Sequence, residues 1–186
     1  MEVMSALEIE DLEKNFKGFK LDIPRLGIPK GFATALIGEN GAGKSTLINI
    51  LAGVRLDYKG TIRYFGGETD EKLIRENIGY TGPNNYFMPH WNLTNVDEVS
   101  SILFTQFHSE KFHELYKELG VDASRKSIDK MSDGMRMKTM LAAVLARDTR
   151  LLLLDEPASP LDPLMRDKLC SLIRDYLDEG NGEKSV

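Results

Sequence analysis

The stretch Gly38-Glu39-Asn40-Gly41-Ala42-Gly43-Lys44-Ser45-Thr46 decides the fold of this chain. It follows an apolar run over 32–37 and leads into apolar residues at helical spacing, which end at Gly53. A strand, a glycine-rich loop and a helix, in that order, are the context in which G-x-x-x-x-G-K-S binds phosphate. We therefore predict a phosphate loop over 38–46, preceded by a strand over Phe32–Ile37.

The residue types in this loop suit the phosphates of a nucleotide. Glycine lets the backbone turn tightly and approach an anion, and the start of the following helix directs its N–H groups to the same place. Lys44 can reach the terminal phosphates, and the Ser45 hydroxyl can ligate Mg²⁺. A glycine-rich turn followed by a chance lysine is the alternative, and it leaves the full pattern unexplained. The loop residues predicted to bind the nucleotide are Gly38, Asn40, Gly41, Gly43, Lys44, Ser45 and Thr46.

Composition limits the class of protein. The chain has 186 residues, a formal net charge of -5 and a single cysteine, Cys170. That length is enough for one domain with a buried core. The lysines and arginines are scattered, so no nucleic-acid partner is expected. No apolar stretch is long enough to cross a bilayer, so we expect a soluble chain that reaches a membrane only through a partner.

Short strands and glycine turns surround the phosphate loop. Alternating apolar and polar residues predict strands over 7–10 and 19–23, arranged antiparallel. Further strands are predicted over 60–67 and 77–81, with a short polar helix over 70–76 between them.

Two aromatic residues, Phe16 and Phe19, flank the turn between the first two strands. Each suits either strand packing or stacking on a nucleotide base, and the sequence does not choose between these. The loop over 82–91 is rich in turn formers and in large apolar side chains. It is either folded under the domain or kept as a docking surface.

The segment from 94 to 147 has a helical composition. One helix is predicted to begin near Thr94 and a second to cover 110–119 before Gly120. The first should bury one face, formed by Val96, Val99, Ile102, Leu103 and Phe107.

The hexamer Met131-Ser132-Asp133-Gly134-Met135-Arg136 opens a third helix. Ser132 or Asp133 can cap that helix, which is the structural interpretation. The functional interpretation is a second helix start that faces a phosphate, with the Ser132 hydroxyl and the Gly134 backbone reaching the anion.

Leu151–Leu154 are four consecutive apolar residues that suit a parallel strand buried on both faces. The acids Asp155 and Glu156 follow at the end of this strand, where open sheets bind ligands. Asp155 can hold Mg²⁺ together with Ser45, and Glu156 can polarise a water against the terminal phosphate. The alternative is a buried strand that merely ends in exposed acids.

Four segments in this order, namely 38–46, 131–135, 151–156 and 159–162, resemble the ATP-binding domain of ABC transporters. The resemblance implies an α/β fold: a P-loop NTPase (RecA-like) core with an N-terminal antiparallel β subdomain and an inserted α-helical subdomain. The implied division of the single domain is 1–90 for the β subdomain and phosphate-loop core, 91–147 for the helical subdomain, and 148–186 for the remaining core.

The resemblance also implies roles for several residues. ATP and Mg²⁺ are the implied cofactors, and Glu156 is the implied catalytic carboxylate. A head-to-tail homodimer or heterodimer is implied, in which Ser132 and Gly134 of one copy face the ATP of the other, with Asp162 contacting across the dimer. Phe16 is the implied base-stacking ring. The implied partner is a separate integral-membrane permease, which places the chain in the cytoplasm against the inner face of the membrane.

Three departures from the family pattern affect these expectations. Pro83 stands where the family usually has glutamine, and Asn84 or Asn85 is the candidate substitute. Met-Ser-Asp-Gly-Met over 131–135 replaces Leu-Ser-Gly-Gly-Gln, a variant that resembles bacterial exporter-type ATPases. The family's switch histidine has no counterpart among His90, His108 and His113, so a C-terminally truncated subunit with impaired hydrolysis is expected.

Two other classes of function remain open. One is a nucleotide-binding fragment without turnover. The other is an ABC-type ATPase that acts on nucleic acid or the ribosome, although no heptad tract separates Lys44 from Asp155 as in chromosome-type members. A P-loop kinase is a weaker possibility, because no acceptor site is evident and the segment 131–135 would be unexplained.

Overall fold

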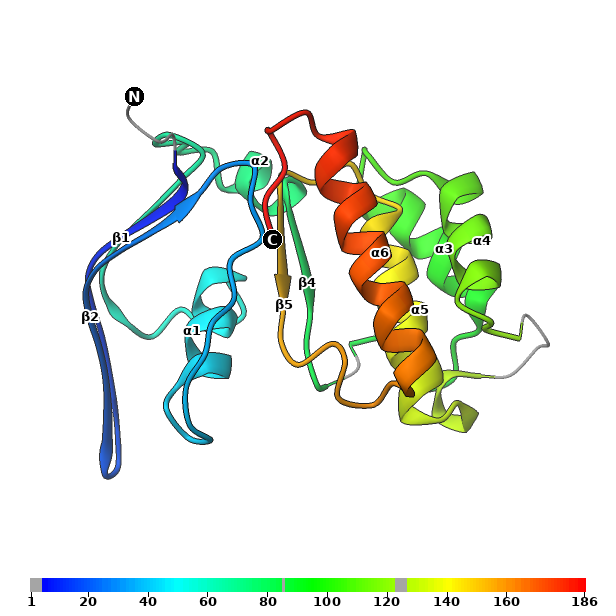
Figure 1. The fold of residues 1–186 in the computed structure, drawn as a ribbon, viewed down its shortest axis with the longest axis horizontal. Coiled ribbons are helices and arrows are strands. Elements are labelled where there is room, and N and C mark those ends of the chain that lie inside the picture. The colour runs from blue at the N-terminus through cyan, green and yellow to red at the C-terminus, as the bar shows by residue number, and fades with distance from the viewer. Residues whose placement is uncertain (1–4, 85, 123–126) are drawn as a thin grey trace.

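The computed structural model describes residues 5–84, 86–122 and 127–186. Its N-terminal part is a three-stranded antiparallel sheet of β1 (Ser5–Phe16), β2 (Phe19–Pro29) and β3 (Lys59–Tyr64), in the order β2-β1-β3. The β1–β2 pair forms a long bent hairpin that extends away from the rest of the molecule (Figure 1). The two strands are longer than the sequence predicts, but their antiparallel arrangement is as expected.

A second, parallel pair of strands holds the centre of the molecule. β4 (Ile78–Thr81) pairs in register with β5 (Leu151–Leu154), so that Ile78 lies opposite Leu151. The helix α1 (Lys44–Leu51) lies between the N-terminal hairpin and this pair (Figure 1). Its buried residues Leu47, Ile50 and Leu51 join a hydrophobic cluster with side chains of β1, β4 and β5.

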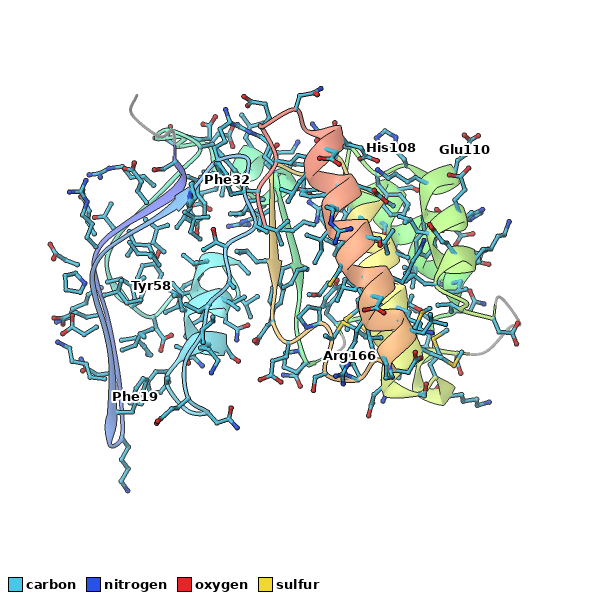
Figure 2. All side chains as sticks on the ribbon, viewed as in Figure 1. Phe19, Phe32, Tyr58, His108, Glu110 and Arg166 are labelled. Carbon is cyan, nitrogen blue, oxygen red and sulfur yellow. The ribbon has the colours of Figure 1, made fainter. Side chains whose placement is uncertain are left out.

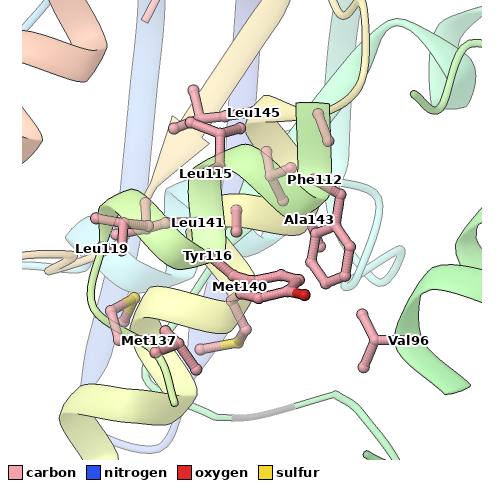
Figure 3. Packing of buried hydrophobic residues seen from close by; sticks show 14 of the residues in the cluster. Val96, Phe112, Leu115, Tyr116, Leu119, Met137, Met140, Leu141, Ala143 and Leu145 are labelled. Carbon is pink, nitrogen blue, oxygen red and sulfur yellow. The ribbon is translucent and has the colours of Figure 1, made fainter. Parts of the chain in front are cut away.

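Helices cover the opposite face of the parallel pair (Figure 1). They are α3 (Leu93–Leu103), α4 (Ser109–Glu118), α5 (Asp133–Leu145) and α6 (Pro163–Glu179), with the short helix α2 (Glu71–Glu76) and a 3-10 turn (Ile128–Lys130) outside this group. Their buried side chains form a second cluster, in which Tyr116 of α4 lies beside Met140 of α5 and Phe112 of α4 lies near Ala143 (Figure 3). The α/β architecture predicted from the sequence is thus confirmed.

The division of the chain into 1–90, 91–147 and 148–186 remains a proposal. Side chains of 91–147 belong to the helical cluster, and side chains of β1 and β2 belong to the other cluster. Within the described residues, no helix combines the length and the hydropathy that a bilayer crossing requires.

The strand predicted over Phe32–Ile37 is wrong, because the structure has an extended loop there. Ladder-type backbone hydrogen bonds join this segment to Val186, with Val186 N–H donating to Phe32 O and Thr34 N–H donating to Val186 O. Among the described residues no neighbouring strand runs along 35–37, so Ile37 is 91% exposed. An apolar run is a strand only when another strand completes its hydrogen bonds.

The predicted buried face of the first helix is also partly wrong. Val96 on α3 is fully buried, but Ile102 is 82% and Leu103 63% exposed. The helix begins at Leu93, capped by Asn92 in a reciprocal pair of hydrogen bonds with Asn95. Leu93 and Val96 belong to the cluster that includes α4 and α5 side chains, whereas residues 101–103 of the last turn are exposed. Helical spacing therefore identified the apolar face of α3, but it did not show where along the helix that face stops being buried.

Candidate nucleotide-binding site

The phosphate loop leads directly into the first turn of α1. Gly43 is the N-cap residue, and no side chain caps this helix start. The free N–H groups of a first turn are donors for an anion. Lys44 donates from Nζ to the carbonyls of Gly38 at 2.7 Å and Glu39 at 2.8 Å, so its ammonium group lies across the loop. The loop thus presents backbone N–H groups and one lysine to the same place.

Two glycines of the loop adopt left-handed backbone conformations. Gly41 has φ of 85° and Gly43 has φ of 95°. A Cβ atom at Gly41 would meet no atom within 4 Å, whereas one at Gly43 would lie 3.0 Å from Cζ of Phe19 and 3.1 Å from Cδ1 of Leu21. Gly43 is therefore required both for its conformation and for the close approach of the hairpin.

We expect Gly43→Ala to destabilise the chain more than Gly41→Ala does. Gly41→Ala adds only the strain of a left-handed alanine, about 1 kcal/mol. Gly43→Ala adds the same strain and displaces the Phe19 ring as well, for about 2–4 kcal/mol in all. Urea unfolding of both variants measures the difference. Equal midpoints for the two variants would show that the Phe19 contact has no energetic weight.

Ser45 and Asp155 meet across α1 and β5. The Ser45 hydroxyl donates to Asp155 Oδ1 at 3.0 Å. Asp155 is 2% exposed, and its second oxygen, Oδ2, is buried without a hydrogen-bond partner among the described residues. An unpaired buried carboxylate oxygen is costly, and hydroxyl and carboxylate oxygens are ligands that Mg²⁺ accepts. These two side chains fit a magnesium ion.

Glu156 lies one residue beyond Asp155 and is exposed. Its φ of 50° is left-handed, which is rare for a residue with a side chain. It faces a cavity of about 450 Å³. The other residues that line this cavity are Phe16, Phe19, Asn40, Gly41, Gly43, Lys44, Ser45 and Thr46. The structure therefore brings Glu156 and most of the predicted loop residues to one cavity.

Both aromatic residues of the hairpin tip line the same cavity. Their ring centroids lie 6.0 Å apart. Lys14 Nζ and the guanidinium of Arg55 lie 5.3 Å and 5.5 Å from the centroid of Phe16. Phe19 packs on the loop at Gly43 instead, on the side of the hairpin that faces the phosphate loop (Figure 2). The contact of Phe19 with the loop joins segments far apart in sequence, and local patterns carried no signal for it.

The remaining predicted residues do not line this cavity. Ser132 caps α5 by accepting from the Met135 N–H at 3.2 Å, and Asp162 caps α6 by accepting from the Met165 N–H at 3.0 Å. A Cβ atom at Gly134 would lie 3.0 Å from the Pro160 carbonyl oxygen. Within the described chain, these three residues are placed by their own helix starts.

Pro83 lies on a separate cavity of about 180 Å³, shared with Asp133, Arg136 and Glu156. Of the two proposed substitutes for glutamine, Asn84 is described by the structure and does not line the nucleotide cavity. Asn84 lines a third, apolar cavity on the other side of α1, and Asn85 is outside the described residues. Arg136 donates to Asp133 and to the Met131 carbonyl, and so holds the turn that precedes α5.

Comparisons with known proteins identify the family of this chain. The family described as "ABC transporter" matches residues 21–159. The tungstate uptake system ATP-binding protein TupC of Peptoclostridium acidaminophilum is 30% identical over 174 residues, 91% of this chain and 80% of TupC. The daunorubicin/doxorubicin resistance ATP-binding protein DrrA of Streptomyces peucetius is 32% identical over 184 residues, 94% of this chain and 55% of DrrA.

A solved structure has the same fold. The dimeric post-hydrolysis state of the ATP-binding cassette MJ0796, bound to ADP and phosphate, superposes with a TM-score of 0.75 at 18% identity. The superposition covers 97% of this chain and 86% of that one.

Proposed function

The chain belongs to the ABC transporter family of ATP-binding domains, and on that premise we propose that it powers transport through a separate membrane permease. The members of this family are ATPases. We propose that ATP binds and is hydrolysed in the cavity between the phosphate loop and Glu156. The observation that supports the proposal most is the meeting of Ser45 with the buried Asp155 beside that cavity.

We propose the following roles within the site. The first-turn N–H groups of α1 and the Lys44 ammonium bind the β- and γ-phosphates. Ser45 and Asp155 hold Mg²⁺, which when bound offsets the charge of the phosphates. Glu156 accepts a proton from the water that attacks the γ-phosphate. Phe16 and Phe19 supply the aromatic surface for the base.

We further propose that two copies close over the nucleotide. Ser132 and Gly134 sit at an exposed helix start that a second copy can present to the phosphates. A Cβ atom at Gly134 would lie 3.0 Å from the carbonyl oxygen of Pro160, which precedes the start of α6 at Asp162. The structure of the ATP-binding cassette MJ0796 is dimeric, in a post-hydrolysis state bound to ADP and phosphate. The choice between a homodimer and a heterodimer is open.

The apolar cavity at the C-terminal end of α1 is the proposed contact with the permease. It has a volume of about 590 Å³ and lies between α1, β4 and the start of the loop over 82–91. Val54 and Leu56 on its rim are 63% and 74% exposed, and Tyr86 adds a half-exposed ring. Exposed apolar side chains gathered at one hollow are typical of an interaction site. The permease would hold the chain at the cytoplasmic face of its membrane.

The direction of transport follows from the permease. We propose an exporter-type system, because of the Met-Ser-Asp-Gly-Met variant at 131–135. Among the relatives, TupC is named for tungstate uptake and DrrA for daunorubicin/doxorubicin resistance. A role on nucleic acid is less supported, because the formal net charge is -5.

We expect Leu56→Asp to abolish binding to the permease and leave ATP binding unchanged. A carboxylate at this position cannot be desolvated against an apolar partner. A candidate permease, purified in detergent and mixed with a tagged copy of the chain, provides the pull-down measurement, and calorimetry provides the ATP affinity. Leu164→Asp is the matched control, because Leu164 is also 74% exposed but lies on α6. Retention of the permease by Leu56→Asp would refute this docking surface.

A further inference from the structure

Helix α1 connects two separate cavities. Its first turn borders the nucleotide cavity with Lys44, Ser45 and Thr46. Its last turn and the residues after it, from Asn49 to Val54, wall the apolar cavity. The position of this one helix therefore determines both where Ser45 stands relative to Asp155 and what shape the apolar cavity has.

Tyr80 fixes that helix to the central strands. It lies on β4, and its hydroxyl donates to Asn49 Oδ1 on α1 at 2.8 Å. The neighbouring strand β5 ends at Asp155, whose N–H donates to the carbonyl of Thr81. This hydrogen bond thus joins the helix that carries Ser45 to the strand that is paired with the Asp155 strand.

The surroundings of Tyr80 hold its ring in place. Its phenol lies over Gly82, where an added Cβ would come within 2.1 Å of the hydroxyl oxygen. Its backbone carbonyl accepts a hydrogen bond from the Tyr86 hydroxyl at 3.1 Å. Burial, together with the negative charge of Asp155, raises the pKa of Tyr80 above its ordinary value. The Tyr80 hydroxyl is therefore protonated at neutral pH and remains a hydrogen-bond donor.

We infer that Tyr80 is a positioning residue for the magnesium site. Its hydrogen bond to Asn49 sets α1 at the distance from β5 at which Ser45 and Asp155 ligate one ion. Tyr80 and Asn49 also line the apolar cavity, so a molecule bound in that cavity would affect the hydrogen bond between them. The side chain of Pro83, in the loop after β4, cannot ligate a metal ion. The magnesium site of this chain therefore depends on how Ser45 and Asp155 are placed.

The structure offers a matched control on the other wall of the same cavity. The Tyr64 hydroxyl donates to the Leu51 carbonyl at 2.9 Å, so it also bonds to the C-terminal end of α1. Tyr64 lies on β3, however, which is paired with β1 in the antiparallel sheet and not with the strand that carries Asp155. Tyr64→Phe removes the same kind of hydrogen bond from the same helix without touching β4.

The test compares ATP affinity with Mg²⁺ and with EDTA for the wild-type chain, Tyr80→Phe and Tyr64→Phe, by calorimetry. We expect Tyr80→Phe to reduce the magnesium-dependent gain in ATP affinity about fivefold, which corresponds to the net free energy of one hydrogen bond. ATP affinity in EDTA should stay within about twofold for both variants, and Tyr64→Phe should keep the full magnesium gain. Equal magnesium gains in the two variants would overturn the inference.

A double-mutant cycle separates this role from a loss of stability. Asn49→Ala should reproduce the effect of Tyr80→Phe, and the combined variant should show no further loss of magnesium gain, because both remove one bond. Additive losses would assign the effects to separate causes and would refute the inference. The inference rests on the proposed ATP and magnesium site, but different results would refute that site and the role of Tyr80. A wild-type chain whose ATP affinity ignores magnesium refutes the site, whereas a normal wild type with an unaffected Tyr80→Phe refutes only the role of Tyr80.

Discussion

Lys44→Ala is expected to weaken ATP binding about 100-fold, which corresponds to about 2.7 kcal/mol. The lysine is the single cation whose ammonium lies across the phosphate loop in the described structure, on the carbonyls of Gly38 and Glu39. Its removal takes away a charge-assisted bond to the phosphates and loosens the loop that positions the N–H donors. Calorimetric titration with ATP and Mg²⁺ measures the change.

The matched control for this prediction is Lys72→Ala. Lys72 is an exposed lysine on α2 that does not line the nucleotide cavity, and its loss alters the net charge of the chain by the same amount. Its ATP affinity should equal that of the wild type. If Lys44→Ala bound ATP within threefold of the wild type, the phosphate loop would not be the nucleotide site, and the proposed function would lose its basis.

Glu156→Gln is expected to lower ATP hydrolysis about 1,000-fold and to leave ATP affinity within about twofold. Glutamine keeps the length of the side chain but cannot accept the proton of the attacking water. Because binding persists while turnover stops, the variant should accumulate as an ATP-bound dimer. Phosphate release measures the rate, and light scattering with ATP and Mg²⁺ measures the mass.

The matched control for this prediction is Glu114→Gln, measured beside a wild-type preparation that hydrolyses ATP. Glu114 is an exposed glutamate on α4 away from the nucleotide cavity. Wild-type hydrolysis in Glu156→Gln would remove Glu156 from the mechanism. A monomer in the presence of ATP would instead count against closure of two copies over the nucleotide.

Local patterns predicted the parts of this structure that depend on neighbours in sequence. The phosphate loop, the buried strand ending at Asp155 and the helix start at Ser132 each depend on a few adjacent residues, whose types dictate conformation. The membership in the ABC transporter family could be predicted for the same reason, since it followed from the order of those segments.

Long-range contacts set the limit of the sequence prediction. The run over 32–37 has the composition of a strand, but pairing partners decide strands, and among the described residues the backbone of this run meets Val186. The contact of Phe19 with Gly43 and the bond from Tyr80 to Asn49 join segments more than twenty residues apart. Neither hydrophobic periodicity nor helix-capping residues predict such contacts.

The left-handed backbone of Glu156 has a consequence for attempts to make this protein more robust. A side chain in that conformation costs about 1 kcal/mol relative to glycine, and asparagine tolerates it better than glutamate does. Selection for heat resistance alone would therefore favour glycine or asparagine at position 156. The hardiest variants from such a screen would be inactive, because the residue proposed to do the chemistry is also one that strains the fold.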